Sequence, residues 1–325
     1  MGVSAQLPCT PFCLRSGGAM SPTYTSTGPA KCGWRRFGGA TERHEIAELD
    51  ETTLLRLARQ VASYNHQGIS REHPLLSAGL PDGSRIQVVA APATRGPMAL
   101  AIRKHVSTNL TLEHYITSGS FDDVQTQSSA TQPIVEAVAK LVDRGEIAEG
   151  LRQAVRGRLN VLISGGTSTG KTTFLNALIG EIPAQERLIL IEDTAELRLQ
   201  HTNAIGLLAA RSALGEADVT TNDLVSASLR MRPDRIILGE LRGREAFAFL
   251  RAVNTGHPGS MTTIHADSVD GAVEQLALLI LEGGTTLSRA DIARYVGVTI
   301  DVFVQLARDE HGRRVSECRV GVPDR

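Results

Sequence analysis

The segment Leu162–Gly180 holds the residues best suited to chemistry. It reads LISGGTSTGKTTFLNALIG. It fits the pattern G-x-x-x-x-G-K-[ST], whose fixed positions are filled by Gly165, Gly170, Lys171 and Thr172. An apolar run typical of a strand precedes the loop and a helical pattern follows it, which is the context in which such a loop binds phosphate. The alternative is a glycine-rich turn that carries a lysine by chance. We predict a nucleotide site here.

Each residue type in this loop suits a bound triphosphate. Glycines let backbone N–H groups turn inward around an anion, and the start of the helix adds the positive end of its dipole. Lys171 would reach the β- and γ-phosphates, and the Thr172 hydroxyl would be a ligand of Mg²⁺. For Thr173, ordinary helix surface is the favoured interpretation. The predicted nucleotide-binding residues of the loop are Gly165, Gly166, Thr167, Ser168, Thr169, Gly170, Lys171, Thr172 and Thr173.

Carboxylates follow two other apolar runs, at the point where each predicted strand ends. LILIED ends in Glu192 and Asp193, and RIILGE ends in Glu240. A parallel sheet directs the carboxyl ends of its strands at the ligand, so the acid pair could hold hydrated Mg²⁺ or orient the attacking water. Glu240 is the candidate for activating that water or holding the metal. The predicted Mg²⁺ contacts, direct or through water, are Thr172, Asp193 and Glu240. Alternatively, one acid of the pair caps the next segment, and Glu240 is a surface acid.

Two histidines and two arginines are further candidates. His257 and His265 bracket one short strand, and an imidazole can donate a hydrogen bond to a phosphate oxygen. Isolated histidines are more often structural, and we favour a functional role for His265. Arg85 and Arg103 belong to a smaller N-terminal region, from which a guanidinium could reach over the phosphates when two domains close. The alternative for each is a solvated arginine on a strand.

Composition limits the possible classes of protein. The chain has 325 residues, 42% of them hydrophobic and 21% charged, which is enough for two domains with buried cores. A formal net charge of -1 excludes a globally basic nucleic-acid binder. The four cysteines form no C-x-x-C pair, no signal segment begins the chain, and no run approaches the roughly 20 apolar residues of a membrane span. We expect plain thiols in a reduced, cytoplasmic setting.

Hydrophobic periodicity supplies the elements that position these residues. We assign no structure to residues 1–40, a helix to residues 50–68 and two strands around residues 83–106. Two further helices precede the phosphate loop, and strand-like and helical runs alternate after it, which indicates a mostly parallel sheet covered by helices. The predicted division is a disordered or divergent leader at 1–40, an α+β domain at 41–105, a linker at 106–132 and an ATPase domain at 133–325.

Four segments together resemble the Walker A, Asp-box, Walker B and His-box series of the secretion traffic ATPases. They read GGTSTGKTT, LILIEDTAEL, SLRMRPDRIILGELRG and NTGHPGSMTTIHADS. The chain is most similar to the VirB-type ATPases of type IV secretion and conjugal transfer, because GISREHPLLSAGLPDGSRIQVVAAP and ALAIRK resemble their N-terminal domain. This likeness covers residues 41–318.

The resemblance implies a fold and a function. It implies an α/β protein, with a RecA-like P-loop NTPase domain and a mostly parallel sheet behind a smaller α+β N-terminal domain. It also implies a Mg²⁺-dependent ATPase that forms a homo-hexameric ring with ATP between the two domains. The motor would energise secretion through inner-membrane channel components, from the cytoplasm or the inner face of the bacterial inner membrane. The residues carried over are Lys171 and Thr172 as phosphate and metal contacts, Glu240 as the Walker B acid, Glu192 and Asp193 as the Asp box, His257 and His265 as the His box, and Arg85 and Arg103 as N-domain arginines.

One departure and two alternatives accompany this reading. Family members usually open with a helix and a first strand where this chain carries its Gly/Pro/Cys-containing leader, so an N-terminal sheet short of an edge strand is an expected consequence. A pilus or type II secretion ATPase is the second reading, although the paired C-x-x-C element of many such proteins is absent. A DNA-dependent motor or a nucleotide switch is the third. The guanine-reading motif [NT]-K-x-D is missing, which counts against a GTPase switch. An interleaved aromatic and basic stretch is also missing, which counts against a motor that tracks along a DNA strand.

Overall fold

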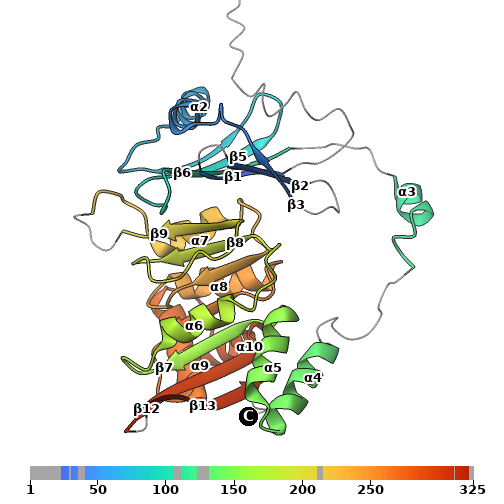
Figure 1. The fold of residues 1–325 in the computed structure, drawn as a ribbon, viewed down its shortest axis with the longest axis vertical. Helices are drawn as coiled ribbons and strands as arrows, with labels where there is room; N and C mark the ends of the chain where they lie inside the picture. Colours follow the sequence, from blue (N-terminus) through green and yellow to red (C-terminus); the bar gives the residue numbers. More distant parts are fainter. Residues whose placement is uncertain are drawn as a thin grey trace, which may run out of the picture.

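The computed structural model describes residues 23–28, 31–35, 41–104, 111–122, 132–210, 215–310 and 312–321. Within these ranges the chain forms two sheets, a smaller N-terminal one and a larger one that carries the phosphate loop. Figure 1 shows the smaller sheet, with helix α2, above the β9 edge of the larger sheet. No helix in these ranges is long and apolar enough to cross a membrane.

The larger sheet is mostly parallel, as predicted. Its strand order is β13-β12-β7-β11-β10-β8-β9, and only the β12–β13 hairpin pairs antiparallel. Strands β7, β8, β10 and β11 are buried along their whole length, which explains why they read as continuous apolar runs. The strands are β7 Val161–Gly165, β8 Leu188–Glu192, β9 Ala204–Leu208, β10 Arg235–Leu238, β11 Met261–Ile264, β12 Val302–Asp309 and β13 Gly312–Val320.

Helices cover both faces of this sheet, and the sheet separates the hydrophobic core into two clusters. Successive residues of β7 point to opposite faces, so Leu162 packs in a cluster with Phe249 of α8, whereas Ile163 packs with Leu175 of α6. Ser288 and Asp291 form a capping box at the start of α10. The helices are α4 Gln132–Asp143, α5 Ile147–Arg156, α6 Lys171–Ile179, α7 Thr221–Ser228, α8 Glu245–Asn254, α9 Val269–Glu282 and α10 Arg289–Thr299.

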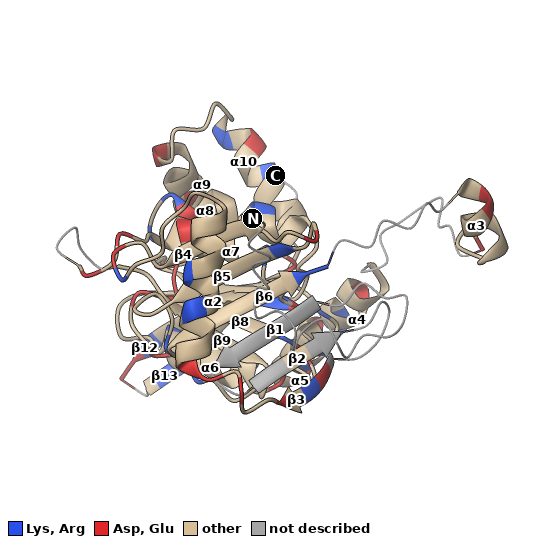
Figure 2. Ribbon diagram, turned by 90° about the horizontal axis from the view of Figure 1, so that it is seen from above, with Lys and Arg blue, Asp and Glu red and all other residues tan. Residues whose placement is uncertain are grey.

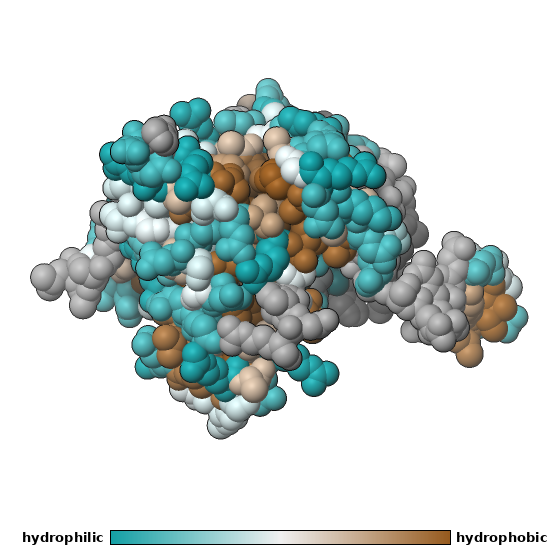
Figure 3. Space-filling model, turned by 90° about the horizontal axis from the view of Figure 1, so that it is seen from below, coloured by the Kyte–Doolittle hydropathy of each residue, from teal (hydrophilic) through white to brown (hydrophobic). Residues whose placement is uncertain are grey.

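The far end of the larger sheet is less completely covered. Val315 and Val320 of β13 and Ile134 of α4 are only partly buried against the core. Seen from below in Figure 3, apolar atoms gather between hydrophilic ones on this face of the molecule. Cys318 of β13 is a free thiol, and burial raises its pKa to about 11.

The smaller sheet is antiparallel and packs against helix α2. Its strand order is β3-β2-β1-β6-β5-β4, and the apolar side of α2 (Glu51–Tyr64) places Leu54, Leu57 and Val61 in one cluster with Val88 and Leu100. Asp50 caps α2, because its side chain accepts a hydrogen bond from the Thr53 amide at 2.7 Å. The predicted helix is confirmed. The strands are β1 Thr23–Gly28, β2 Lys31–Arg35, β3 Thr41–Glu45, β4 Leu75–Gly79, β5 Arg85–Ala90 and β6 Met98–Arg103.

The prediction that residues 1–40 have no regular structure is wrong for β1 and β2. Strand β1 pairs antiparallel with β6, which places Thr23–Ser26 against Leu100–Arg103, and β2 pairs with β1. The leader therefore supplies a strand to β6, and the expectation of a missing edge strand is also wrong. The threonines and tyrosine of TYTSTG favour a strand, but pairing through the backbone leaves no long apolar pattern in the sequence. Residues 1–22, 29–30 and 36–40 lie outside the described ranges.

The segment 106–132, interpreted as a linker, includes a short helix in its described part, residues 111–122. Helix α3 spans Leu112–Thr117, and Figure 1 shows it apart from both sheets. Its apolar side chains are exposed, with Leu112 at 68% and Ile116 at 51%. Residues 105–110 and 123–131 lie outside the described ranges.

Candidate nucleotide-binding site

A cleft of about 540 Å³ lies at the carboxyl ends of β7, β8, β10 and β11. The phosphate loop follows β7, and Asp193, Glu240 and His265 follow the other three strands into the same cleft. The rule that parallel strands present their carboxyl ends to the ligand therefore brings most of the predicted side chains together. The loop residues Gly166 to Thr173 all line the cleft.

The phosphate loop owes its shape to its glycines. Gly170 has a φ of 92°, a left-handed conformation that disfavours other residues, and helix α6 begins directly after it. At Gly165 an added Cβ would lie 2.5 Å from Thr169 Oγ1 and 3.0 Å from the Leu306 carbonyl oxygen, so no larger residue fits. The predicted strand, turn and helix are confirmed at these positions.

Lys171 lies in the wall of the cleft with only 9% of its surface exposed. Its Nζ donates hydrogen bonds to the carbonyl oxygens of Gly165 at 3.0 Å and Gly166 at 3.3 Å. The same atom lies 3.2 Å from His265 Nδ1 and 3.9 Å from Glu240 Oε1. Burial lowers the pKa of Lys171, the Glu240 carboxylate opposes this effect, and Arg242 adds to it. The ammonium group is thus held between the loop and the acid that follows β10.

Glu240 is the centre of the polar groups in the cleft. Its Oε1 lies 2.8 Å from His265 Nε2, and its Oε2 accepts a hydrogen bond from Arg242 Nε at 2.6 Å. The carboxylate is 14% exposed, so it is not the surface acid of the alternative reading. This position is close enough to the Lys171 ammonium to act on a phosphate group bound by the loop.

Arg242 connects two of the predicted acids and was not itself predicted. Its Nη1 donates to Asp193 Oδ2 at 3.1 Å, while its Nε contacts Glu240. The hydrogen bond to Glu240 raises the pKa of Arg242 despite partial burial. Thr221 Oγ1, at the start of α7, donates to Asp193 Oδ1 at 3.4 Å. The sequence signal that could have indicated Arg242 as a site residue is its position two residues after Glu240, in GELRG.

Glu192 lines the cleft, but its carboxylate binds other groups. Its Oε1 accepts hydrogen bonds from the backbone N–H groups of Glu196 at 2.9 Å and Leu197 at 2.7 Å. Its Oε2 forms an ion pair with Arg95 of the smaller domain, and the Glu192 side chain is only 4% exposed. The alternative that one acid of the pair caps the next segment therefore holds for Glu192. Nothing in the sequence around Arg95 pointed to this partner.

Gly165 ends β7 without lining the cleft, and three predicted side chains also lie outside it. Arg85 and Arg103 are exposed register partners on β5 and β6 of the smaller sheet. His257 precedes β11 and so lies at the amino end of the sheet, away from the phosphate loop. Its Nδ1–H donates to the Pro233 carbonyl oxygen at 3.0 Å, and burial lowers the pKa of His257. The structure does not bring these three side chains to Lys171.

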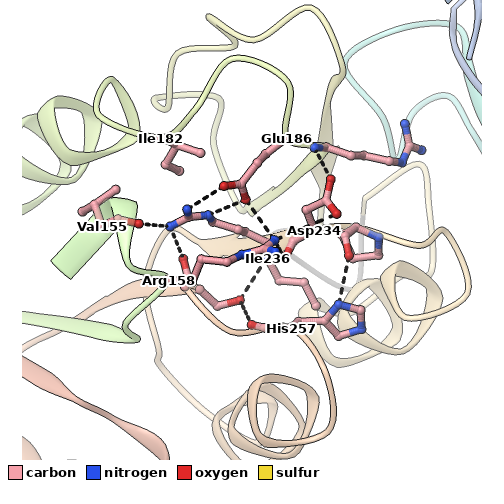
Figure 4. Close-up of polar contacts among 12 residues, drawn as sticks. Val155, Arg158, Ile182, Glu186, Asp234, Ile236 and His257 are labelled. Atoms are coloured by element: carbon pink, nitrogen blue, oxygen red, sulfur yellow. Dashed lines mark hydrogen bonds and ion pairs between the residues drawn. The ribbon is translucent and has the colours of Figure 1, made fainter. Parts of the chain in front are cut away.

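His257 lies beside a polar network at the amino ends of β8, β10 and β11, which Figure 4 shows. Arg235, with no exposed surface, donates to both carboxylate oxygens of Glu186 at 2.8 Å and to the Val155 carbonyl oxygen at 2.6 Å. Arg158 donates to the same carboxylate at 3.0 Å. These bonds connect α5 and the loop before β8 to the sheet. The place of His257 beside this network indicates a structural role for the histidine.

Arg313 on the β12–β13 hairpin also lines the cleft and was not predicted. Its Nε donates to the Ser168 carbonyl oxygen at 3.2 Å, and an added Cβ on Gly170 would lie 3.1 Å from its Cδ. The sequence offers no pattern that separates Arg313 from its neighbour Arg314. Their opposite directions follow from the alternation of side chains along a strand.

The fold and the cleft define a P-loop nucleotide-binding protein with an added N-terminal domain, and comparison with known proteins identifies the family. A family model described as Type II/IV secretion system protein matches residues 71–294. The type IV secretion system protein VirB11 of Bartonella quintana is 40% identical over 287 residues, which cover 84% of this chain and 81% of that protein. The protein PtlH of Bordetella pertussis is 37% identical over 280 residues, which cover 85% and 82%.

A solved structure agrees with these relatives. The crystal structure of the VirB11 ATPase from the Brucella suis type IV secretion system, in complex with sulphate, superimposes with a TM-score of 0.89 at 34% identity. The likeness covers 96% of each chain, so it includes both the smaller and the larger sheet. The chain belongs to the Type II/IV secretion system protein family, as a VirB11-type traffic ATPase.

Proposed function

We propose that this chain hydrolyses ATP to ADP and phosphate, with Mg²⁺, to energise a type IV secretion or conjugal DNA-transfer apparatus. One observation carries the proposal. The Lys171 ammonium, held by the phosphate loop, lies within 4 Å of both Glu240 and His265 from two other strands. A lysine that cradles the phosphates and a side chain that positions the attacking water are recurring parts of sites for phosphoryl transfer to water.

The residues divide the chemistry between them. The loop amides and Lys171 would bind the β- and γ-phosphates, and Glu240 would orient the attacking water through its carboxylate. His265, beside both groups, would donate a hydrogen bond to a phosphate oxygen. Asp193 and Arg242 would hold the acid side of the cleft in place. This arrangement supports catalysis by positioning and charge neutralisation rather than by a covalent intermediate.

The residues present fit Mg²⁺. Thr172, Asp193 and Glu240 all bring oxygen atoms to the cleft, and Mg²⁺ prefers oxygen ligands with several of its waters retained. When bound with the nucleotide, the ion would neutralise charge on the phosphates. Thr172 would be its direct protein ligand, and the two carboxylates would hold its waters.

Assembly and location are further parts of the proposal. The chain would act as a homo-hexameric ring in the cytoplasm, against inner-membrane channel components of the secretion system. The apolar area bordered by hydrophilic atoms in Figure 3 suits a contact with another protein. Arg85 and Arg103 would approach the nucleotide only after a movement of the smaller domain. Mass measurement with and without nucleotide tests the ring.

The alternative functions have less support. The relatives described above are type IV secretion proteins, which favours that role over a pilus or type II secretion motor. A DNA-dependent motor needs clustered positive charge, whereas basic and acidic residues are interspersed on the face shown in Figure 2. Strong stimulation of ATP hydrolysis by single-stranded DNA in a purified monomer would favour the DNA motor.

The deciding experiment is phosphate release by the purified chain. We expect hydrolysis of ATP that needs Mg²⁺ and stops on chelation by EDTA. Absence of both hydrolysis and nucleotide uptake in calorimetry would overturn the proposal.

A further inference from the structure

A short segment of the smaller domain lies against the β9 edge of the larger sheet. Thr94 forms a bridge with Leu207, the Leu208 amide donates to the Ala93 carbonyl oxygen at 2.9 Å, and the Arg95 amide donates to the Gly206 carbonyl oxygen at 2.9 Å. Backbone contacts of this kind fix the position of Arg95 relative to the ATPase sheet. Any movement of the smaller domain as a body must therefore move or break this segment.

The Arg95 side chain extends from this segment to the strand beside it. Its Nη2 forms an ion pair with Glu192 Oε2, and its Nη1 donates to the Leu197 carbonyl oxygen at 2.6 Å. The arginine is 17% exposed and the carboxylate 4%, so water screens the pair weakly. Arg95 thus contacts both the end of β8 and the loop that follows it.

Glu192 transmits this contact to the cleft. One of its oxygens holds the amides of Glu196 and Leu197, and the other meets Arg95. The next residue is Asp193, whose carboxylate lies in the cleft 3.1 Å from Arg242 Nη1. Glu192, which the smaller domain binds through Arg95, is therefore the direct chain neighbour of Asp193, an acid at the nucleotide site.

We propose that Arg95 is a positioning residue, which sets Asp193 in the cleft by holding Glu192 and the loop at residues 193–197. The arrangement of the smaller domain then controls the acid side of the site. This inference rests on the proposed function, since it concerns the hydrolysis of ATP in that cleft. It gives Glu192 a role in coupling the two domains.

A second, more exposed ion pair between the two domains provides a control for loss of a domain contact alone. Arg71, before β4, pairs with Glu216, beyond β9, and its Nη2 donates to Glu216 Oε2 at 2.8 Å. Both side chains are more than half exposed, at 63% and 54%, and neither lines the cleft. If Arg95 acted only by joining the domains, loss of the Arg71–Glu216 pair would lower turnover as well.

The test uses the full chain with Arg95→Met and Glu192→Gln, singly and together, beside the control Arg71→Met/Glu216→Gln. Arg95→Met alone leaves a buried carboxylate without its partner, so we expect a lower melting temperature as well as lower turnover. The double variant has no unpaired charge, and the amide that replaces the Glu192 carboxylate keeps an oxygen for the two loop N–H groups. We expect its melting temperature to recover while kcat stays roughly ten- to hundredfold below the parent at little changed KM.

Three results separate the possible failures. Parental kcat in Arg95→Met/Glu192→Gln, with hydrolysis intact in the parent, would overturn the positioning role alone. An equal fall of kcat in the Arg71→Met/Glu216→Gln control would overturn it too, because any link between the domains would then suffice. A parent chain that neither binds nor hydrolyses ATP would instead refute the proposed function. Partial recovery of kcat in Arg95→Lys is the expected result of keeping the charge without the paired N–H groups.

Discussion

His265 Nε2 lies 2.8 Å from Glu240 Oε1, although the two residues follow different strands of the larger sheet. Strands β11 and β10 are parallel neighbours, so the residues after their carboxyl ends meet at one edge. Strand β7 pairs with β11 on the other side and places the phosphate loop beside them. The site is therefore a product of strand order, and changes to its side chains should alter hydrolysis more than folding.

Lys171→Ala should abolish hydrolysis and weaken nucleotide binding, because it removes the cation that the loop holds against the phosphates. We expect a rate at least about a hundredfold lower, measured by phosphate release, and a clear loss of affinity in calorimetry. Lys140→Ala, on the exposed side of α4, is the matched control and should behave like the parent. Wild-type affinity in Lys171→Ala would show that the nucleotide does not bind in this loop.

Arg242→Gln should lower kcat without a large change in stability. The guanidinium is 63% exposed, so its loss should change the free energy of unfolding by less than about 0.5 kcal/mol. It nevertheless connects Asp193 and Glu240, and these acids should take up less defined positions without it. Steady-state kinetics beside thermal melting would check this. Unchanged kcat would mean that Arg242 is an ordinary surface residue.

Arg235→Ala should destabilise the fold strongly. The side chain is fully buried and donates to both oxygens of Glu186, so its removal breaks a buried ion pair and leaves the carboxylate with Arg158 alone, at a cost of about 3–5 kcal/mol. Arg235→Met/Glu186→Gln should recover part of this loss, because neither residual side chain is charged. Urea denaturation measures both variants. A small effect in the single variant would contradict the role assigned to the network in Figure 4.

His257 should make the folded state sensitive to mild acid. Burial is the main cause that lowers the pKa of His257 below its ordinary value of 6.5. The unfolded chain then binds the proton more readily than the folded chain, so stability falls as the pH drops below about 6.5 and levels off only below the folded pKa.

The measurement is the urea midpoint between pH 5 and 7.5 for the parent and His257→Asn. We expect a shallower dependence on pH in the variant. His66→Asn is the control, because His66 is exposed and its positive φ of 54° suits asparagine. An identical slope in His257→Asn and the parent would show that His257 does not titrate differently on folding.

Much of the larger domain could be predicted because its signals are local. Strands buried on both faces read as apolar runs, and glycines mark the phosphate loop by the shape they allow. The rule that parallel strands present their carboxyl ends to the ligand could have separated the two histidines, since His265 follows β11 whereas His257 precedes it. Only the carboxyl end of a parallel strand faces this cleft.

The remaining contacts depend on tertiary structure. Arg95 reaches Glu192 from another domain, and no spacing within APATRGP indicates that partner. Strands β1 and β2 form through backbone pairing with β6 and with each other, which leaves little hydrophobic periodicity. Arg242 lay within a recognised segment, yet its bonds to two acids follow only from the folding of β8 next to β10.

Phosphate release by Glu240→Gln shows whether Glu240 acts on water beside a phosphate held by Lys171. The amide keeps the size of the side chain and removes the charge that orients the water. We predict parental affinity for ATP in calorimetry and no measurable phosphate release. Turnover equal to that of the parent would contradict the claim.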